Sequence, residues 1–133
     1  MKTAKQVLGY QGEEAAIRHL VRSGYHLLER NWRIGHLEVD IIAEQYGTLV
    51  FVEVKSRKKA NPSEALEAVA HTKQGNLIEA AREFLLLHGL DNPVRFDIIA
   101  VTGTDNTPQI THVRDAFSAE SYARVERSRT LRA

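Results

Sequence analysis

The chain has 133 residues, the usual size of one domain, and its 43% apolar and 26% charged residues are typical of a folded globular protein. Cysteine is absent, which excludes disulfides, thiolate zinc sites and cysteine nucleophiles, and the net charge of +1 does not by itself indicate nucleic-acid binding. No apolar run approaches the roughly 20 residues of a membrane span, and no signal segment follows Met1, so we expect a cytoplasmic protein without membrane contact.

The first predicted elements are a helix over residues 12–23 and a strand over residues 25–33. The apolar residues of the helix recur at helical spacing, whereas aromatic and aliphatic residues alternate with polar ones in the strand. Residues 37–44 and 48–55 are two further strands. A short polar turn at Tyr46-Gly47 joins them, which predicts a β-hairpin.

The second half of the sequence alternates between helical and strand patterns. The predicted elements are a basic loop from Arg57, a short helix from Pro62 toward Val69, a helix over residues 72–88, a buried strand over residues 94–101, a weaker strand over residues 109–113, and a helix from Ser118.

This order predicts one α/β domain over residues 1–118. Its central mixed sheet would contain a meander of three strands, then a crossover helix that returns a further strand to the same sheet, with helices on the flanks. Residues 119–133 would form a basic C-terminal helix or tail. The arginines of this tail are interpreted either as a phosphate-binding arm or as a solvated end.

Charged residues interrupt the two strands of the hairpin, which are otherwise apolar. In residues 48–55, alternation of side chains places Glu53 and Lys55 on one face together with Phe51. In residues 37–44, the same alternation places Glu38 and Asp40 on one face. The opposite face would then carry the apolar side chains of Leu37, Val39 and Ile41.

The turn also predicts which residues of the hairpin face one another. If Tyr46-Gly47 is a two-residue loop, Asp40 lies opposite Glu53, and Glu38 lies opposite Lys55. Two carboxylates opposed on a sheet destabilise it and raise the pKa of one of them. A divalent cation between them would remove this penalty, because hard cations bind carboxylate oxygens.

Glu13 is a candidate third carboxylate. It precedes Ile17 by four residues and Leu20 by seven, so it lies on the apolar face of the predicted helix. An acidic residue in a first helical turn also favours the helix dipole, which is the alternative interpretation. The neighbouring Glu14 is expected to pair with Arg18 on the solvent side.

These residues favour metal-assisted hydrolysis of a phosphodiester. Asp40 and Glu53, with the main-chain carbonyl of Val54 and with Glu13 as a further candidate ligand, would hold Mg²⁺ or Mn²⁺. Lys55 would position the attacking water or stabilise the charge of the transition state. Neighbouring phosphates would be held by the basic residues that follow, Arg57, Lys58 and Lys59.

Several residues allow a structural interpretation as well. Lys55 and Glu38 could form an ordinary cross-strand ion pair on a solvent-facing sheet. Asp97, inside an apolar strand, is either catalytic or paired with Arg95 or a helix end. Trp32 either stacks on a base or belongs to the core.

The histidines do not support a zinc site. His36-x-Glu38 is the only local pairing of metal-ligand type, and no HExxH motif accompanies it. The other histidines are expected at the surface or at helix ends: His19, His26, His71, His88 and His112.

The acidic residue Asp40 on one strand and Glu53-x-Lys55 on the next resemble the signature of the PD-(D/E)XK nuclease superfamily. Within it, the chain resembles the bacterial YraN family, which is related to archaeal Holliday-junction resolvases. The motifs that carry this resemblance are Gly9-Tyr10-Gln11-Gly12-Glu13, Asn31-Trp32-Arg33, Glu38 to Ala43, Phe51 to Arg57, Arg95 to Val101 and Ala116-Phe117. One departure is Leu37, where the family usually has glycine.

The resemblance implies a restriction-endonuclease-like fold with Glu13, Asp40, Glu53 and Lys55 in the catalytic positions. It also implies that either Lys73 or Gln74 of the later helix faces the site and contacts nucleic acid. Glu38 is interpreted as a residue that supports the metal ligands rather than as a ligand itself.

We therefore expect a Mg²⁺-dependent endonuclease-like protein that acts on DNA, with branched or damaged DNA as the candidate substrate. One alternative is a nucleic-acid-binding protein that keeps the fold without catalysis. Another is an interaction domain with a solvated, charged sheet face. The related junction-cutting enzymes imply a homodimer, because two symmetric cuts need two sites.

Overall fold

The computed structural model describes residues 1, 3–57, 71–103 and 107–132. The elements in these ranges are α1 (Ala4–Arg22), β1 (His26–Ile34), β2 (Leu37–Gln45), β3 (Thr48–Arg57), α3 (His71–His88), β4 (Val94–Thr102), β5 (Gln109–Phe117) and α4 (Ala119–Arg132). The short helix predicted from Pro62, and the two predicted phosphate contacts Lys58 and Lys59, lie outside the described residues.

The five strands form one mixed sheet in the order β1-β2-β3-β4-β5. β1, β2 and β3 are antiparallel neighbours, β3 and β4 are parallel, and β5 returns antiparallel to β4. A parallel pair needs a crossover connection, and α3 lies between β3 and β4 in the chain. The predicted α/β class, meander and crossover are therefore confirmed, and the architecture is consistent with a restriction-endonuclease-like core.

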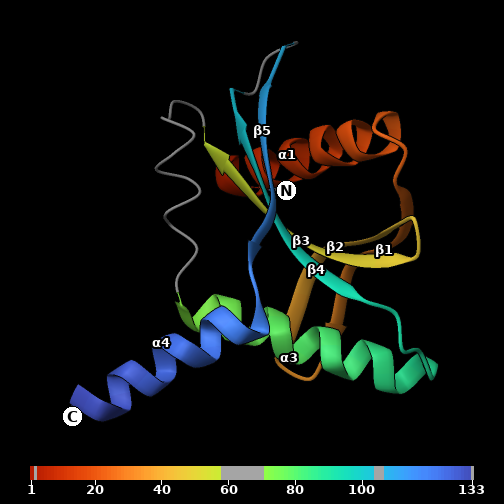
Figure 1. Cartoon of the computed structure of the whole chain (residues 1–133). Coiled ribbons are helices and arrows are strands. Elements are labelled where there is room, and N and C mark those ends of the chain that lie inside the picture. Colours follow the sequence, from red (N-terminus) through yellow and green to blue (C-terminus); the bar gives the residue numbers. More distant parts are fainter. Residues whose placement is uncertain (2, 58–70, 104–106, 133) are drawn as a thin grey trace.

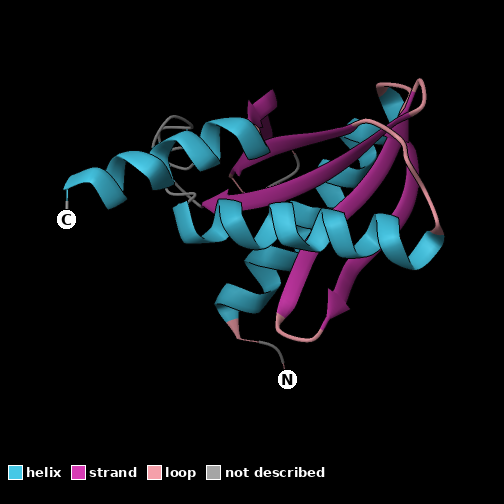
Figure 2. Ribbon diagram, turned by 60° about the horizontal axis from the view of Figure 1, so that its bottom comes forward, coloured by secondary structure: helices cyan, strands magenta, loops and turns pink. Residues whose placement is uncertain are grey.

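Helices cover both faces of the sheet. α1 lies on one face and α3 on the other, while α4 extends away from the sheet beyond β5 (Figures 1 and 2). No helix within the described ranges is both long and apolar enough to cross a bilayer.

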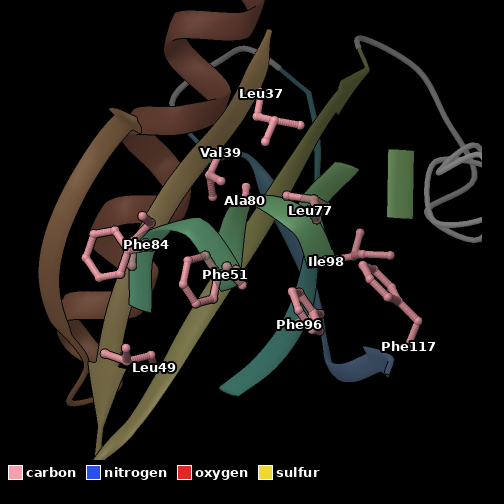
Figure 3. Close-up of a cluster of buried hydrophobic side chains, with 12 residues drawn as sticks. Leu37, Val39, Leu49, Phe51, Leu77, Ala80, Phe84, Phe96, Ile98 and Phe117 are labelled. Atoms are coloured by element: carbon pink, nitrogen blue, oxygen red, sulfur yellow. The ribbon is translucent and has the colours of Figure 1, made fainter. Parts of the chain in front are cut away.

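Each face of the sheet has its own apolar core. Between the sheet and α3, Leu77, Ala80 and Phe84 of the helix pack on Phe51 and Phe96 of the strands (Figure 3). On the other face, α1 packs on the second core, which contains Ala15, Ala16, Leu20, Ile41, Val50, Val52 and Ile99. Trp32 belongs to the first core, where its ring meets Phe84 edge to face at 5.3 Å.

The hairpin between β2 and β3 has the predicted two-residue turn. Tyr46 has φ 51° and Gly47 has φ 82°, as a type I′ turn requires at both central positions. The register that follows pairs Gln45 with Thr48 and continues to Ile41 and Val52, which confirms the predicted pairing over this stretch.

Two predicted boundaries were wrong. α1 begins at Ala4 rather than at residue 12, because Thr3 and Gln6 form a capping box at its start. The glycines at positions 9 and 12 weaken the helical pattern of this segment, which hid the early start. β5 extends to Phe117 instead of ending at Val113, with a register irregularity opposite Asp97.

The predicted faces of β2 were also wrong in part. Leu37 and Val39 pack in the same core as Ile42, on the α3 side, whereas Ile41 packs on the α1 side. Regular alternation would separate Val39 from Ile42. The strand therefore changes the face of its side chains at Asp40, which lies between these residues.

Candidate functional site

The site forms where β2 and β3 stop pairing. Their register ends at Ile41 and Val52, and one residue further on Asp40 accepts a hydrogen bond through Oδ2 from the backbone N–H of Val54 at 2.8 Å. Asp40 and Glu53 thus follow the last pair of the ladder rather than lying inside it. Asp40 and Glu53 therefore lie at the same end of the hairpin, as predicted, but they are not a directly opposed pair of the ladder.

The predicted contact between Glu38 and Lys55 is replaced by other ion pairs. Glu38 lies 3.5 Å from Nη2 of Arg33 on the neighbouring strand β1. Lys55 places Nζ 3.5 Å from Oε1 of Glu53. The interpretation of Lys55 and Glu38 as a cross-strand pair is therefore wrong, because the two strands have separated before they reach these residues.

Glu53 is the most buried charged residue of the site, with 3% of its surface exposed. Two ammonium groups, Nζ of Lys55 and Nζ of Lys73 at 3.4 Å, lie close to its Oε1. Burial and, second, the charge of Asp40 nevertheless raise the pKa of Glu53 from 4.5 to about 7. The positive charges of the two lysines therefore offset only part of the free-energy cost of removing this carboxylate from water.

Asp40 is perturbed in the same direction. Burial raises its pKa, and the hydrogen bond from Val54 and the charge of Lys73 oppose this only in part. The charge of Asp40 in turn raises the pKa of Glu53, so the two carboxyl groups act on each other. A proton or a cation between two such groups relieves their repulsion.

Glu13 of α1 approaches this pair from the other side of the sheet. Burial and the charge of Asp40 raise the pKa of Glu13, whereas Arg30, with Nε at 3.8 Å, and a hydrogen bond from Asn31 lower it. Its Oε1 is buried without a hydrogen-bond partner among the described residues. The same oxygen lies 3.8 Å from Nε of Arg30, which is an ion-pair distance without a hydrogen bond. A buried carboxylate oxygen that accepts no hydrogen bond is uncommon in proteins.

Arg30 also explains why a predicted surface pair is wrong. Nη1 of Arg30 forms a close ion pair with Oε1 of Glu14, so Glu14 turns toward β1 rather than along the helix to Arg18. The guanidinium lies 5.2 Å from the ring centre of Tyr10. Arg30 therefore ties α1 to the strand that borders the site.

A close contact of α1 with β3 brings Glu13 to the site. A Cβ on Gly12 would lie 1.7 Å from Oγ and 2.9 Å from Cβ of Ser56, so only glycine permits this approach. Ser56 follows Lys55 on β3, and Glu13 follows Gly12 on the helix. The packing of Gly12 thus fixes the catalytic candidates of two elements relative to each other.

These residues line a cavity of about 400 Å³. Glu13, Asp40, Glu53 and Lys55 all contribute to its wall, and so does the backbone segment of Val54 that the metal proposal uses. Besides Lys55, the basic residues of its wall are Lys5 and Arg57. Four candidates that lie far apart in the sequence therefore share one wall, as the sequence predicts.

Of the two candidates on α3, Lys73 is the one that contacts the site, through its ion pair with Glu53. Sequence reasoning missed Lys5, Arg30 and Asn31. The Thr3–Gln6 capping box would have extended the helix and placed Lys5 two turns before Glu13. Asn31 belongs to the motif Asn31-Trp32-Arg33 but was not assigned to the site, and its φ of 51° is a conformation that asparagine tolerates better than most residues.

A divalent cation fits the chemistry of Asp40 and Glu53 but has few ligands here. The described residues contain no group of three His, Cys, Asp or Glu side chains arranged around one metal position. Mg²⁺ in proteins is commonly held by one or two carboxylates and several waters. The residues that fit it are therefore Asp40, Glu53 and the Val54 carbonyl.

Asp97, the other buried acidic residue of the sheet, has a different environment. Arg95 donates to both of its carboxylate oxygens at 2.8 and 2.9 Å, His112 donates to Oδ2 at 2.7 Å, and the backbone N–H of Asp115 donates to Oδ1 at 3.1 Å. The structural alternative for Asp97 thus accounts for its burial. The expectation that His112 is a surface or capping residue was wrong, because its side chain is 7% exposed.

The sequence matches the model of the uncharacterised protein family UPF0102 over residues 12–101. A UPF0102 protein of Bacteroides fragilis is 41% identical over 111 residues, which cover 84% of this chain and 92% of the relative. A UPF0102 protein of Bacteroides thetaiotaomicron is 43% identical over 110 residues, 83% of this chain and 91% of the relative. One of Desulforapulum autotrophicum is 42% identical over 121 residues, 90% of this chain and all of the relative. The chain belongs to the UPF0102 family, which confirms the resemblance to the YraN family.

Proposed function

We propose that this member of the UPF0102 family is a metal-dependent endonuclease-like protein that hydrolyses phosphodiester bonds in DNA, with branched or damaged DNA as the candidate substrate. The observation that carries the proposal is the pair of buried Glu53 and half-buried Asp40 in the wall of an open cavity. Their raised pKa values mark carboxylates whose neighbouring positive charges offset only part of the cost of burial, as is common at catalytic sites.

The fit of a cation to these residues supports the proposal. Asp40, Glu53 and the carbonyl of Val54 would hold Mg²⁺ or Mn²⁺. Glu13, whose Oε1 accepts no hydrogen bond among the described residues, would orient the surrounding waters. When bound, the cation would acidify a water and neutralise charge on the phosphoryl oxygens.

The side chains of the cavity would carry out the remaining steps. Lys55 would donate from Nζ to the phosphoryl oxygen that gains charge in the transition state. Lys73 would hold Oε1 of Glu53 in place through their 3.4 Å contact. Arg57 and Lys5, at the basic part of the wall, would hold neighbouring phosphates of the strand.

Calorimetric titration with Mg²⁺ and Mn²⁺ tests the metal, and cleavage of linear, nicked and four-way-junction DNA tests the reaction. Wild type should bind metal and cut at least one substrate. Asp40→Ala/Glu53→Ala should lose both properties, while Lys55→Met should keep metal binding and lose cleavage. Glu29→Gln, an exposed carboxylate on β1, is the matched control. Cleavage by the double variant at the wild-type rate would refute the assignment of these residues.

One observation favours the alternative of a DNA-binding protein without catalysis. Lys55 and Lys73 both contact Oε1 of Glu53, so the carboxylate has cationic partners even in the absence of metal. DNA binding in EDTA with a steep salt dependence, together with no cleavage by wild type, would favour this alternative. A homodimer stays a prediction, which sedimentation with and without junction DNA tests.

A further inference from the structure

A series of hydrogen-bonded ionisable side chains, Asp97, His112 and His19, crosses the α1 face of the sheet. Nε2 of His112 on β5 lies 2.7 Å from Oδ2 of Asp97 on β4, and its Nδ1 lies 3.0 Å from Nε2 of His19 on α1. The side chain of Asp97 is fully buried, whereas His19 is only half-buried. This series of side chains therefore leads from the core to the outer layer of the protein.

The ionisation of Asp97 determines the direction of its hydrogen bond with His112. Burial pulls the pKa of Asp97 upward, but hydrogen bonds from His112, Arg95 and the backbone of Asp115 outweigh it and hold that pKa below its usual value. The ionised carboxylate only accepts, so His112 donates through Nε2. Nε2 of His19 and Nδ1 of His112 are 3.0 Å apart, so one of them donates to the other and this contact occupies Nε2 of His19. The ring of His19 is thereby held in one orientation with Nδ1 as its remaining polar atom.

His19 lines a cavity of about 460 Å³ between the C-terminal half of α1 and the beginning of β5. Arg18 and Arg22 of the same helix line it as well. Both arginines are exposed, and among the described residues neither has a carboxylate partner. Two unpaired guanidinium groups and one oriented imidazole therefore face a single hollow.

The charges around His19 are mainly positive. Burial, then the electrostatic effect of His112 and of Arg114 on β5, lower the pKa of His19, and the ring of Tyr25 lies next to His112. The C-terminus of α1 contributes roughly half a negative charge, which two full guanidinium charges on Arg18 and Arg22 outweigh. An anion in the cavity would reverse the effect of these neighbours on His19, because its charge favours the imidazolium.

We propose that this cavity binds a phosphate group, to which Arg18 and Arg22 supply positive charge and protonated His19 donates a hydrogen bond through Nδ1. Binding takes up one proton when it converts neutral His19 to the imidazolium. The site is separate from the carboxylate pair, since the two cavities share no lining residue among those that the structure describes. The inference does not depend on the proposed nuclease function.

The test follows the ring resonances of His19 by NMR in the full-length protein while inorganic phosphate is added near pH 6 and near pH 8. Sulfate is the second probe, because its charge does not change in this range. We expect a saturable shift with both anions, tighter binding at the lower pH, and a higher pKa of His19 in their presence. The absence of a saturable shift at tens of millimolar of either anion would overturn the proposal.

Variants localise the effect. Arg18→Gln/Arg22→Gln should weaken binding about tenfold or more, because charge-assisted hydrogen bonds are lost. Arg18→Lys/Arg22→Lys keeps the charges and should retain most of the affinity. It controls for the substitution of these two positions as such, because it differs from the Gln variant in charge. The control is Arg82→Gln, an exposed arginine of α3 on the opposite face. Equal affinity in the Gln double variant and wild type would refute the site.

A duplex DNA arm identifies the source of the phosphate. If the duplex displaces inorganic phosphate from His19, the site recognises the nucleic-acid backbone. If phosphate binds and the duplex does not compete, the site recognises a free phosphate or a phosphomonoester. Both results support phosphate recognition at this cavity.

Discussion

The ionisation of Glu53 should make stability depend on pH. Burial, the main cause, and the charge of Asp40 raise its pKa from 4.5 to about 7, so the folded protein keeps a proton that the unfolded chain releases near pH 4.5. The stability linked to this group is complete below the unfolded pKa and is lost as the pH rises through the folded pKa. At about 1.4 kcal/mol per pKa unit, the loss is about 3 kcal/mol.

The substitution Glu53→Gln isolates this effect, because the amide resembles the protonated carboxyl in shape and carries no charge. Near pH 5 the two proteins should have similar free energies of unfolding. Near pH 8 the variant should be more stable by about 3 kcal/mol. Urea unfolding in EDTA, followed by the fluorescence of Trp32 at its contact with Phe84, measures both.

The control is Glu120→Gln, which removes a carboxylate whose side chain is 83% exposed and should leave the pH profile unchanged. A difference between Glu53→Gln and wild type that is the same at both pH values would refute the reasoning, because the substitution would then act through packing alone. If the proposed cation binds, Mg²⁺ near pH 8 should stabilise wild type and leave Glu53→Gln unaffected.

Two further predictions concern the neighbours of Glu53. Gly12→Ala should destabilise the protein by about 1–3 kcal/mol through its collision with Ser56, whereas Gly9→Ala, with open space around its new Cβ, should stabilise it by about 0.5–1 kcal/mol; thermal unfolding of both variants checks this, and equal shifts in Tm would contradict it. Lys73→Met removes a charge that lowers the pKa of Glu53, so the midpoint of the stability loss should move to higher pH; an unchanged midpoint in the urea experiment would show that Lys73 does not act on Glu53.

Local turn chemistry made the centre of the fold predictable. The turn Tyr46-Gly47 determined the register of β2 and β3, and the register brought Asp40 and Glu53 to the same end of the hairpin. The apolar run from Val94 to Thr102 was recognisable because a parallel strand is covered on both faces. These features depend on residues that are near each other in the sequence.

Other features depend on contacts between distant residues, and there sequence reasoning failed. His19 and His112 are 93 residues apart, and no periodicity relates them. The change of face at Asp40 could not be derived by counting every second residue, because that rule assumes a regular strand. Lys73 was one of two open alternatives, since the helical pattern alone does not determine which turn of α3 meets Glu53.

The two acidic centres of the sheet show why burial alone does not identify a functional carboxylate. Asp97 is fully buried, yet four hydrogen bonds satisfy its oxygens and its pKa is lowered. Glu53 is buried and Asp40 is half-buried, but the lysines at Glu53 and the Val54 N–H at Asp40 offset only part of the cost of burial, and both pKa values are raised. The same fold therefore compensates one carboxylate fully and the other two only in part. Since buried charge that its neighbours offset only in part reduces stability, the pair of Asp40 and Glu53 supports the proposal that a cation binds there.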